Sequence, residues 1–490
     1  ILFNNKSTSN FNPFLYFHPN TIAKRINSGI SLSQFSDLPV DENYIKCISK
    51  EVQSIKTISR WLNGVCITGD SLKIISLKEK FLFISGIYFV NLNQKNSTVC
   101  EQDKELPYSE KLRKMQMKLM HESYFDSMKL RGKEVIIAVF DGGFPDVNKH
   151  EAFKYLNDNK RILSCYNFVK KDTNVYESIN HGTAVLSNIA GISANKKLGL
   201  ATDAKFLLAI TEEIAETFAE EENWLSAAEW ADKNGADIIN CSLGYTHSRY
   251  FQTQMNGSVS LVSKAANIAA SKGILCFISA GNEGNKNWKF IATPADADSA
   301  ITVGGIDPKT RLHFSFSSYG IAENKKTKPN IVAPGTTTVA KPNNKYGIMF
   351  GTSFSSPLAA GFAACILEQN PSLRGKPMEL KKLLEENSTL YPYFDLANGY
   401  GELMPKSLKQ KSTGNVASFD FSLTKDSIII YPKLSRLNNE YLYWKLIDEN
   451  DQIIHYSVLK IDNTNSFSIA KTNARKVEIF YGGYYRKETF

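Results

Sequence analysis

The heptapeptide Gly-Thr-Ser-Phe-Ser-Ser-Pro at residues 351–357 sets a serine where nucleophilic chemistry would be favoured. Because proline is tolerated in the first turn of a helix, Pro357 predicts a helix start here, continued by the small apolar residues 358–365. Free backbone N–H groups and the positive end of the helix dipole would stabilise a developing oxyanion. A Ser/Thr-rich loop that caps a core helix explains the heptapeptide equally well, so the motif alone does not decide.

Three other segments place a polar side chain beside glycine at a predicted strand end or helix start. Each is also explained, taken singly, as a turn residue or a helix cap. Their shared setting nevertheless favours one common site, because glycine permits tight turns and close backbone approach. The three side chains are Asp141 after the strand 134–140, His181 at the start of a helix, and Asn282 after the strand 274–279.

The elements that must position these side chains alternate between strand and helix from residue 111 to about 410. Short apolar runs predict strands at 134–140, 205–210, 237–242, 274–279 and 301–303, and helix-length segments lie at 183–190, 224–233 and 261–272. Buried strands that alternate with helices predict an α/β fold with a doubly wound, mainly parallel sheet. In such folds functional sites gather beyond the carboxyl ends of the strands.

Two smaller units flank this region. Residues 1–105 combine strands at 65–68 and 81–90 with a helix at 70–79, which predicts an α+β module followed by a polar linker to about residue 110. Residues 413–490 alternate apolar and polar positions at 427–431, 441–447, 452–461 and 476–485. That alternation predicts a small β-sandwich-like domain.

Composition excludes several classes of protein. The net charge of +9 over 490 residues comes without a Lys/Arg tract, which argues against a nucleic-acid partner. The seven cysteines show no CxxC or Cys/His ligand spacing and indicate neither a disulfide framework nor a zinc site. No membrane span is predicted, because the run 81–90 is too short and the run 347–367 is interrupted by Ser, Thr and Pro357. The chain begins at Ile1 without an initiator Met, so we expect an N-terminal targeting segment to be missing from this sequence.

Read together, the four motifs resemble those of the subtilisin-like serine proteases, the subtilases. They stand as Ile-Ala-Val-Phe-Asp-Gly-Gly ending at Gly143, His-Gly-Thr-Ala-Val from His181, Ser-Ala-Gly-Asn-Glu-Gly from Ser279, and the heptapeptide around Ser353. The order Asp, His, Asn, Ser is that of the family and differs from the Ser, Asp, His order of the α/β-hydrolases. The Gly-x-Ser-x-Gly elbow of those hydrolases is also absent, which disfavours the alternative of an ester-cleaving acyl hydrolase.

The resemblance implies a role for each of these residues. Ser353 would be the nucleophile, His181 the general base and acid, and Asp141 the carboxylate that orients the imidazole. Asn282 would donate to the oxyanion together with the backbone N–H of Ser353. Gly142 departs from the pattern, since many subtilases carry Ser or Thr there, and it marks a subgroup in preference to a dead enzyme. Ser355 and Ser356 are the rival nucleophiles, but they lack the preceding Gly-Thr.

The resemblance also implies where an extended peptide would bind. Ser242, Leu243 and Gly244 would pair with it as an added strand. Such pairing recognises the substrate backbone more than its side chains, which favours broad endopeptidase activity. Ala280 and Gly281 would form one wall of the pocket for the residue before the cleaved bond, with a floor from 288–294. Six glutamates at 212, 213, 216 and 220–222 predict either a solvated, acidic helix start or a surface that favours Lys or Arg in the substrate.

Further segments are similar to a group of secreted subtilases from Bacteroidetes-type bacteria, among them Ser-Asp-Leu-Pro-Val from Ser36 and Ser-Arg-Trp-Leu-Asn from Ser59. The first unit would then be a propeptide that assists folding and acts as an intramolecular inhibitor, with processing within residues 93–110. We expect a secreted or cell-surface proenzyme that acts on proteins or peptides. The C-terminal domain is either a type IX sorting domain or an accessory domain that packs on the enzyme.

Two alternatives remain beside a broad endopeptidase. A catalytically silent subtilase would serve as a binding module, and a maturation protease would have a narrow substrate range. Catalysis of this type requires no cofactor. Several members of the family hold structural calcium through irregular carbonyl sites that no sequence motif marks, so a metal site stays open here.

Overall fold

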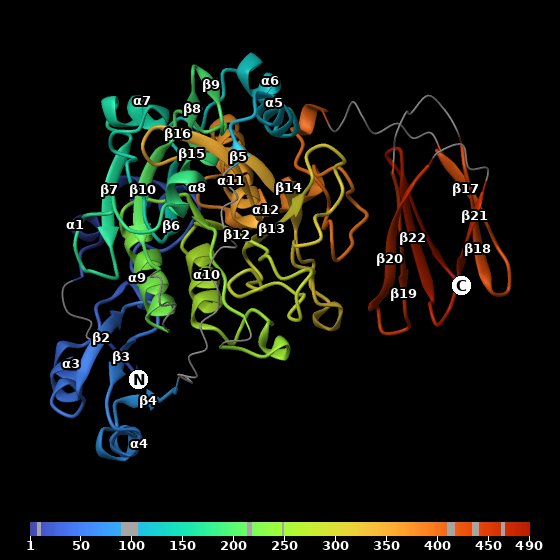
Figure 1. Ribbon diagram of the computed structural model, residues 1–490. Helices are drawn as coiled ribbons and strands as arrows, with labels where there is room; N and C mark the ends of the chain where they lie inside the picture. The colour runs from blue at the N-terminus through green and yellow to red at the C-terminus, as the bar shows by residue number, and fades with distance from the viewer. Residues whose placement is uncertain are drawn as a thin grey trace.

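A seven-stranded parallel sheet forms the centre of the molecule (Figure 1), as the alternation of strands and helices predicts. The computed structural model describes residues 1–6, 11–89, 106–212, 218–246, 249–408, 417–433, 441–461 and 466–490. The strand order is β14-β13-β12-β11-β6-β10-β7, and every neighbouring pair is parallel. The strands are β6 (Ile136–Asp141), β7 (Ile162–Asn167), β10 (Lys205–Ile210), β11 (Ile238–Cys241), β12 (Leu275–Ser279), β13 (Ile301–Ile306) and β14 (Ile331–Pro334).

Strand β6 shows why this sheet is covered on both faces. Its residues are buried throughout, and successive side chains point to opposite faces. Ile137 and Val139 belong to a core with helices α8 (His181–Ala190), α11 (Thr352–Gln369) and α12 (Pro377–Glu386). Ile136, Ala138 and Phe140 belong to a second core with α9 (Ala219–Lys233) and α10 (Leu261–Ser271). The later strands lie on both sides of β6, with β7 and β10 on one side and β11 to β14 on the other. Asp141, at the carboxyl end of β6, therefore lies at a topological switch point, where α/β folds place their sites.

Helix α11 begins earlier than its proline predicts. Gly351 is the N-cap and Thr352 the first helical residue, so Pro357 lies in the second turn and not in the first. A proline there removes the hydrogen bond that its N–H would give to the carbonyl of Ser353. The hydroxyl of Ser242 donates to that carbonyl at 2.8 Å instead, which explains how the helix tolerates the proline. Prediction of the helix was right, and the position of its first turn was wrong.

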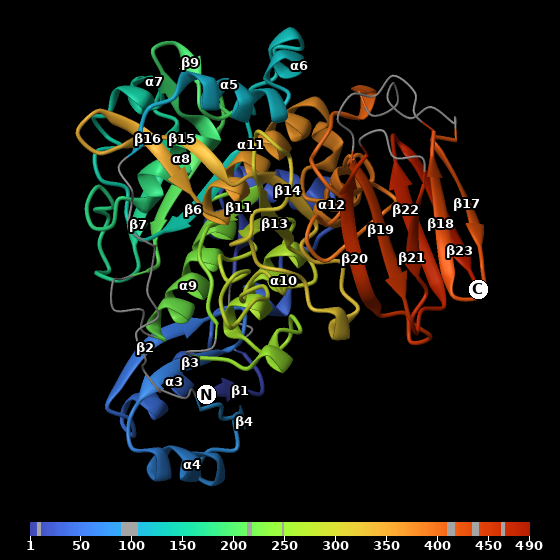
Figure 2. The same cartoon turned by 45° about the vertical axis from the view of Figure 1, so that its right-hand side comes forward.

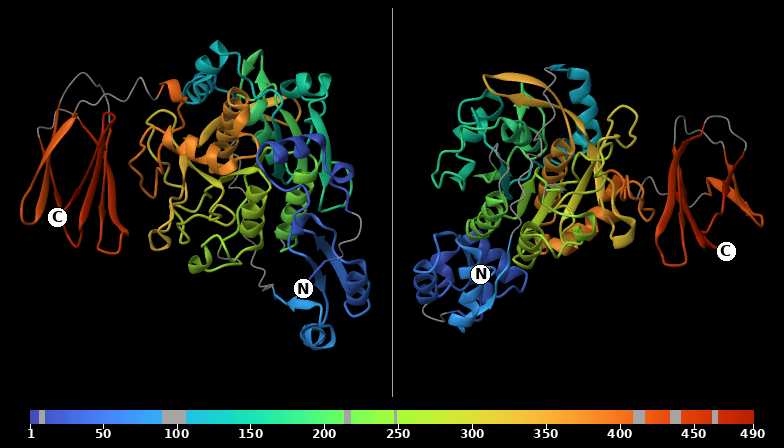
Figure 3. Two further views of the ribbon diagram at one scale, coloured as in Figure 1. Left: turned by 180° about the vertical axis from the view of Figure 1, so that it is seen from behind. Right: turned by 60° about the horizontal axis from the view of Figure 1, so that its bottom comes forward.

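The N-terminal module packs beneath α9 and α10 (Figure 2). Its antiparallel sheet has the order β2-β3-β1-β4, with β1 Leu2–Phe3, β2 Ser54–Ser59, β3 Gly64–Thr68 and β4 Ile84–Gly86. The predicted strand 81–90 is therefore shorter in the structure, and residue 90 lies outside the described ranges. Helices α3 (Glu42–Ser49) and α4 (Ser71–Lys80) complete the module, in agreement with the predicted α+β composition. Two further helices, α1 (Pro13–Tyr16) and α2 (Pro19–Asn27), run along the back of the central domain (Figure 3).

The C-terminal residues form two facing sheets with one shared core, as in a sandwich. The sheets are β17-β18-β21 and β20-β19-β22-β23. The run 476–485, expected to be one strand, is a hairpin of β22 (Lys476–Tyr481) and β23 (Tyr484–Thr489), because Gly482 and Gly483 both adopt positive φ angles at the turn. The remaining strands are β17 (Phe419–Leu423), β18 (Ser427–Pro432), β19 (Tyr441–Ile447), β20 (Ile453–Lys460) and β21 (Phe467–Ala470).

This sandwich packs on the central domain. Leu390 and Tyr393 share an apolar cluster with Phe480 of β22. Beside that cluster Lys445 is buried, donates from Nζ to the carbonyl of Phe394 at 2.7 Å, and pairs with Glu478 at 2.9 Å. This contact does not distinguish an accessory domain from a sorting domain, and both stay predictions.

The other elements join these layers. Strand β5 (Leu106–Pro107) adds to the hairpin of β15 (Thr336–Lys341) and β16 (Lys345–Phe350), which the sequence analysis did not predict. The remaining helices are α5 (Glu110–Leu119), α6 (Glu122–Ser127) and α7 (Lys154–Asp158), and a two-stranded hairpin is made of β8 (Ile192–Ser193) and β9 (Lys196–Lys197).

Candidate active site

Asp141 and His181 form a close pair at the carboxyl edge of the sheet. The Nδ1 atom of His181 lies 3.0 Å from each carboxylate oxygen of Asp141, whose side chain is fully buried. The pairing requires glycine on both backbones, because a Cβ at Gly143 would lie 2.3 Å from the carbonyl oxygen of Glu177 and one at Gly182 would lie 2.4 Å from that of Gly143. The two Gly positions let the end of β6 and the start of α8 approach this closely.

Gly142, the departure from the family pattern, is accounted for by a neighbour. A Cβ at this position would lie 2.8 Å from Cδ1 of Ile179. The backbone N–H of Gly142 donates to Oδ1 of Asp141 at 2.8 Å, so the carboxylate keeps a local donor without a hydroxyl beside it. A larger residue would require the side chain of Ile179 to shift, and the carboxylate is undisturbed.

Ser353 is the second residue of α11 and directly precedes Phe354, which contacts His181. The ring of its neighbour Phe354 is 5.6 Å from the imidazole of His181, and the Oγ of Ser353 donates to the carbonyl of Ser242 at 3.3 Å. The two rival serines are turned into the core: Ser355 donates to the carbonyl of Pro334 and is fully buried, whereas Ser353 keeps 8% of its surface exposed.

Ser356 is tied down in the same way. It is fully buried, and its hydroxyl donates to Oδ1 of Asn240 at 2.9 Å. Asn240 belongs to β11, so this bond also fixes α11 against the sheet. Of the three serines in the heptapeptide, only Ser353 keeps part of its surface exposed.

Asn282 is oriented by the residue that precedes Ser353. Its Oδ1 accepts from the backbone N–H of Thr352 at 2.9 Å and from the hydroxyl of Thr352 at 3.0 Å. The same hydroxyl accepts from the N–H of Gly281 at 3.1 Å. With Oδ1 held in this way, the Nδ2 donor lies beside Gly351, where a Cβ would come within 3.3 Å of it. The side chain of Thr352 thus connects the Asn282 segment to the start of α11.

The five residues expected to contact substrate line one region. Ser242, Leu243 and Gly244 follow β11, and of these Gly244 is exposed. Ala280 and Gly281 follow β12. Ala292 lies between the two segments: a Cβ at Gly244 would be 2.8 Å, and one at Gly281 3.6 Å, from the Cβ of Ala292. Ala292 belongs to the segment 288–294 predicted as the pocket floor, and it contacts both of the other segments; the floor itself stays a prediction.

The glutamates do not form the solvated helix start that their number suggests. Glu220 and Glu221 are fully buried; Arg249 donates to Glu220 at 2.9 Å, and Tyr250 donates to Glu221. Burial raises the pKa of Glu221, while the bonds from Tyr250 and Arg249 act in the opposite direction. Glu222 accepts from Thr57 of the N-terminal module at 3.4 Å. Glu213 and Glu216 lie outside the described residues.

Two contributors were missed by the sequence analysis: Thr352, whose hydroxyl orients Asn282, and Asn240, which anchors Ser356. Both carried a signal. Thr352 belongs to the heptapeptide, and Asn240 is a polar residue within an otherwise apolar strand. Their partners are distant in the sequence, so only the folded chain connects them.

The arrangement combines a hydroxyl, an imidazole held by a buried carboxylate, and amide donors at a helix start, which is the equipment for acyl transfer. In the ranges that the structure describes, no three His, Cys, Asp or Glu side chains gather as a metal site would require. Among the same residues no helix is both long and apolar enough to cross a membrane.

Known proteins resemble two parts of the chain. The model of the subtilase family matches residues 132–402, and that of the Bacteroidota propeptide domain of peptidase S8 matches residues 1–105. Serine protease AprX of Bacillus subtilis (strain 168) is 30% identical over 292 residues, which cover 53% of this chain and 62% of AprX. The chain thus spans less than two thirds of that relative.

Two other similarities cover the same region. Subtilisin DY of Bacillus licheniformis is 32% identical over 216 residues, which cover 44% of this chain and 72% of the relative. The crystal structure of a cold adapted subtilisin-like serine proteinase covers 56% of this chain and 88% of its own, with 25% identity and a TM-score of 0.44.

Proposed function

This chain belongs to the subtilase family, and from that premise we propose that it is a serine endopeptidase made as a proenzyme. The observation that carries the proposal is the buried Asp141 carboxylate, 3.0 Å from Nδ1 of a histidine that lies beside the start of α11. With Nδ1 held by the carboxylate, Nε2 is the nitrogen that would transfer the proton, and Ser353 is the serine of the heptapeptide that keeps part of its surface exposed.

In the proposed reaction the Oγ of Ser353 attacks the carbonyl carbon of a peptide bond while His181 takes the hydroxyl proton. Asp141 stabilises the imidazolium that forms. The oxyanion accepts hydrogen bonds from Nδ2 of Asn282 and the N–H of Ser353, which is free because the first amides of a helix have no intrahelical acceptor. His181 then returns the proton to the leaving amine. Water next attacks the acyl-enzyme, and His181 takes a proton from the water and gives it to Oγ of Ser353 as the acyl group leaves.

Substrate would bind as an extended strand along Ser242, Leu243 and Gly244, with the side chain before the cleaved bond between Gly244 and Gly281. The exposed backbone at Gly244 supports this assignment. Every group that the reaction uses is a side chain or a backbone amide, so we propose no cofactor.

We further propose that residues 1–105 are the propeptide and act as an intramolecular inhibitor, that residues 111–410 are the catalytic domain, and that residues 413–490 are a separate β domain. The enzyme would act outside the cytoplasm or at the surface of a bacterium. Cell fractionation of a producing strain tests the location, and protein found only in the cytoplasm would contradict it.

Labelling with a fluorophosphonate, followed by casein digestion, tests the activity. After removal of the propeptide we expect the wild type to be labelled and to digest casein, and Ser353→Ala to do neither. Ser355→Ala is the matched control, because its hydroxyl serves the core alone. Labelling that survives in Ser353→Ala would refute the assignment of the nucleophile, and labelling without casein digestion would favour the narrow maturation protease.

A further inference from the structure

Residues 11–38, here called the arm, leave the N-terminal module and follow the back of the central domain (Figure 3). The arm contains α1, α2 and the short helical turn Phe35–Asp37. It contacts the amino end of the sheet: Arg374 donates to Oδ1 of Asn20 at 3.0 Å and to the carbonyl of Glu134, just before β6. Asp141 ends that strand, and six residues of parallel strand put roughly 16 Å between its two ends.

The arm caps the carboxyl end of α9. The last carbonyls of a helix have no intrahelical donor and lie at the negative end of its dipole. Donors from the arm reach the carbonyls of the last two residues of the helix and of two residues just beyond its end, and one of these donors belongs to a buried lysine. The contacts are Thr21 Oγ1 to the carbonyl of Asp232 at 2.5 Å, His18 N–H to Lys233 at 2.8 Å, Asn20 Nδ2 to Gly235 at 2.5 Å, and Lys24 Nζ to Ala236.

A chain of buried charges joins the arm to α9 and α10. Lys272 lies 2.6 Å from Asp37, Asp37 lies 2.8 Å from Arg25, and Arg25 lies 2.5 Å from Asp232. The signs alternate, the two outer residues belong to the central domain, and the two inner ones belong to the arm. None of the four side chains is more than 2% exposed. This set is called the ion-pair chain below.

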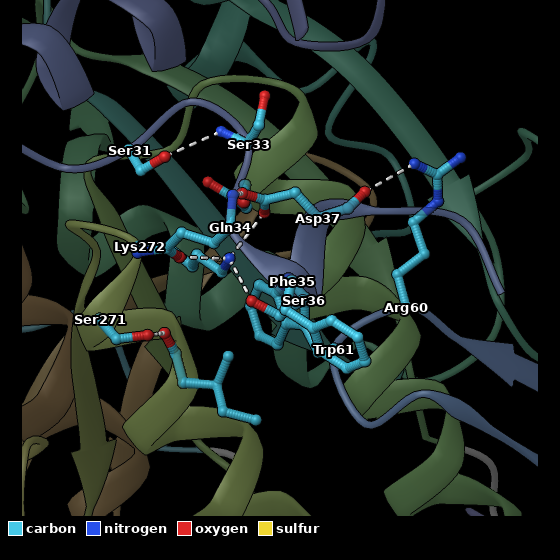
Figure 4. Close-up of polar contacts among 12 residues, drawn as sticks. Ser31, Ser33, Gln34, Phe35, Ser36, Asp37, Arg60, Trp61, Ser271 and Lys272 are labelled. Carbon is cyan, nitrogen blue, oxygen red and sulfur yellow. Dashed lines mark hydrogen bonds and ion pairs between the residues drawn. The ribbon is translucent and has the colours of Figure 1, made fainter. Parts of the chain in front are cut away.

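Lys272 is satisfied entirely by the arm (Figure 4). An ammonium group has three donors, and those of Lys272 reach Oε1 of Gln34, Oγ of Ser36 and Oδ1 of Asp37, each at 2.6 Å. Burial lowers the pKa of Lys272, and Asp37 opposes that effect. Three convergent acceptors around a buried lysine make a specific docking site, because any other occupant would have to replace all three.

We propose that the arm with its ion-pair chain holds the propeptide on the enzyme, independently of any part of the propeptide that occupies the active-site cleft. The ion-pair chain lies at the opposite end of the sheet from Asp141, so clearing the cleft does not break it. After the linker is cut, the arm keeps the propeptide at high local concentration near the cleft, and release requires the ion-pair chain to separate. This timing rests on the proposed function, whereas the docking itself does not.

The experiment uses the full chain with Ser353→Ala, which removes the proposed nucleophile, and a recognition site for a sequence-specific protease inserted within residues 93–105. The chain is cut by the added protease, and retention of the N-terminal fragment is measured by size-exclusion chromatography over a dilution series. We expect the fragment to stay bound in the parent. Lys272→Met removes one of the two cationic partners of Asp37, and Asp37→Asn leaves the buried Lys272 without its ion-pair partner, so we expect at least tenfold weaker binding in each variant.

Two comparisons make the result specific. Lys309→Met removes an exposed lysine of the central domain and should leave binding within twofold of the parent. The double variant Lys272→Met with Asp37→Asn removes both members of one pair, so its loss should be smaller than the product of the two single losses. Binding by Lys272→Met and Asp37→Asn that equals that of Lys309→Met would overturn the proposal.

A milder change covers the case in which a charge variant does not fold. Gln34→Ala with Ser36→Ala removes two neutral acceptors of Lys272 and no charge, and we expect three- to tenfold weaker binding. Unchanged binding in that variant also overturns the proposal. Because an added protease makes the cut, absence of peptidase activity in the wild type would refute the proposed function without affecting this result.

Discussion

The hydroxyl of Thr352 gives a sharp test of how the site is held together. It donates to Oδ1 of Asn282 at 3.0 Å and accepts from the N–H of Gly281 at 3.1 Å. Thr352→Val preserves the shape of the side chain and removes both bonds, while the backbone N–H of Thr352 still reaches Oδ1 at 2.9 Å. Asn282 therefore keeps one of the two bonds that orient it, and its Nδ2 donor becomes less well aimed.

The size of the effect follows from those bonds. A hydrogen bond contributes about 1 kcal/mol net, so two lost bonds set an upper limit of about 2 kcal/mol. Removing an oxyanion donor outright costs about 2.7 to 4 kcal/mol, and a misdirected donor should cost less than that. We expect Thr352→Val to lose about 1 to 2 kcal/mol of transition-state stabilisation. That corresponds to a fall of about 5- to 30-fold in kcat, with KM nearly unchanged because the oxyanion exists only in the transition state.

Steady-state kinetics on a chromogenic peptide, after propeptide removal, measure this change. Thr352→Ser keeps the hydroxyl and should stay close to the wild type. If Thr352 acts through Asn282, the double variant with Asn282→Leu should be no slower than Asn282→Leu alone. A Thr352→Ser enzyme as slow as Thr352→Val, or fully additive losses in the double variant, would refute the reasoning.

Three other predictions concern stability. Ser242→Ala removes the donor that replaces the helix bond lost at Pro357 and leaves the buried carbonyl of Ser353 unpaired, so we expect about 1 to 3 kcal/mol less stability by urea unfolding, and no loss would contradict this account. Lys328→Met removes a buried amino group that donates to the carbonyl of Ala300 at 2.9 Å; thermal unfolding should reveal a lower Tm, and an unchanged Tm would show that the bond is dispensable. Burial lowers the pKa of His313 to about 4, so between pH 4 and 6.5 the unfolded chain binds a proton that the folded chain does not. The free energy of unfolding should therefore rise with pH across this window by an amount on the order of 3 kcal/mol. His313→Gln should flatten that part of the stability profile.

The parallel sheet and the positions of the four site residues could be predicted from local patterns. Strand β6 is buried on both faces, whereas buried and more exposed positions alternate along β18 of the C-terminal domain. Asp141, His181 and Asn282 each follow or begin such an element beside glycine. Because parallel strands end at one edge of a sheet, their convergence followed from the fold class.

Errors arose where the backbone conformation depends on distant partners. Pro357 suggested a first helical turn, but the hydroxyl of Ser242, 115 residues earlier in the chain, lets the helix begin at Thr352. Glu220 and Glu221 were predicted to be solvated because no residue near them in the sequence could offset the cost of burying their charges. Arg249 pairs with both carboxylates, and Tyr250 donates a hydrogen bond to Glu221, from another segment of the chain.

The sequence by itself determined which residues are candidates for the site, because side-chain type and motif spacing are local properties that the strand and helix pattern carries to one edge of the sheet. Only the tertiary structure decided which serine keeps its hydroxyl out of the core, how Asn282 is oriented, and that the arm meets Lys272 and Asp232. Those outcomes depend on buried polar groups finding partners far away in the chain. A buried charge or carbonyl accepts whichever donor the fold brings to it, and no local pattern specifies that donor.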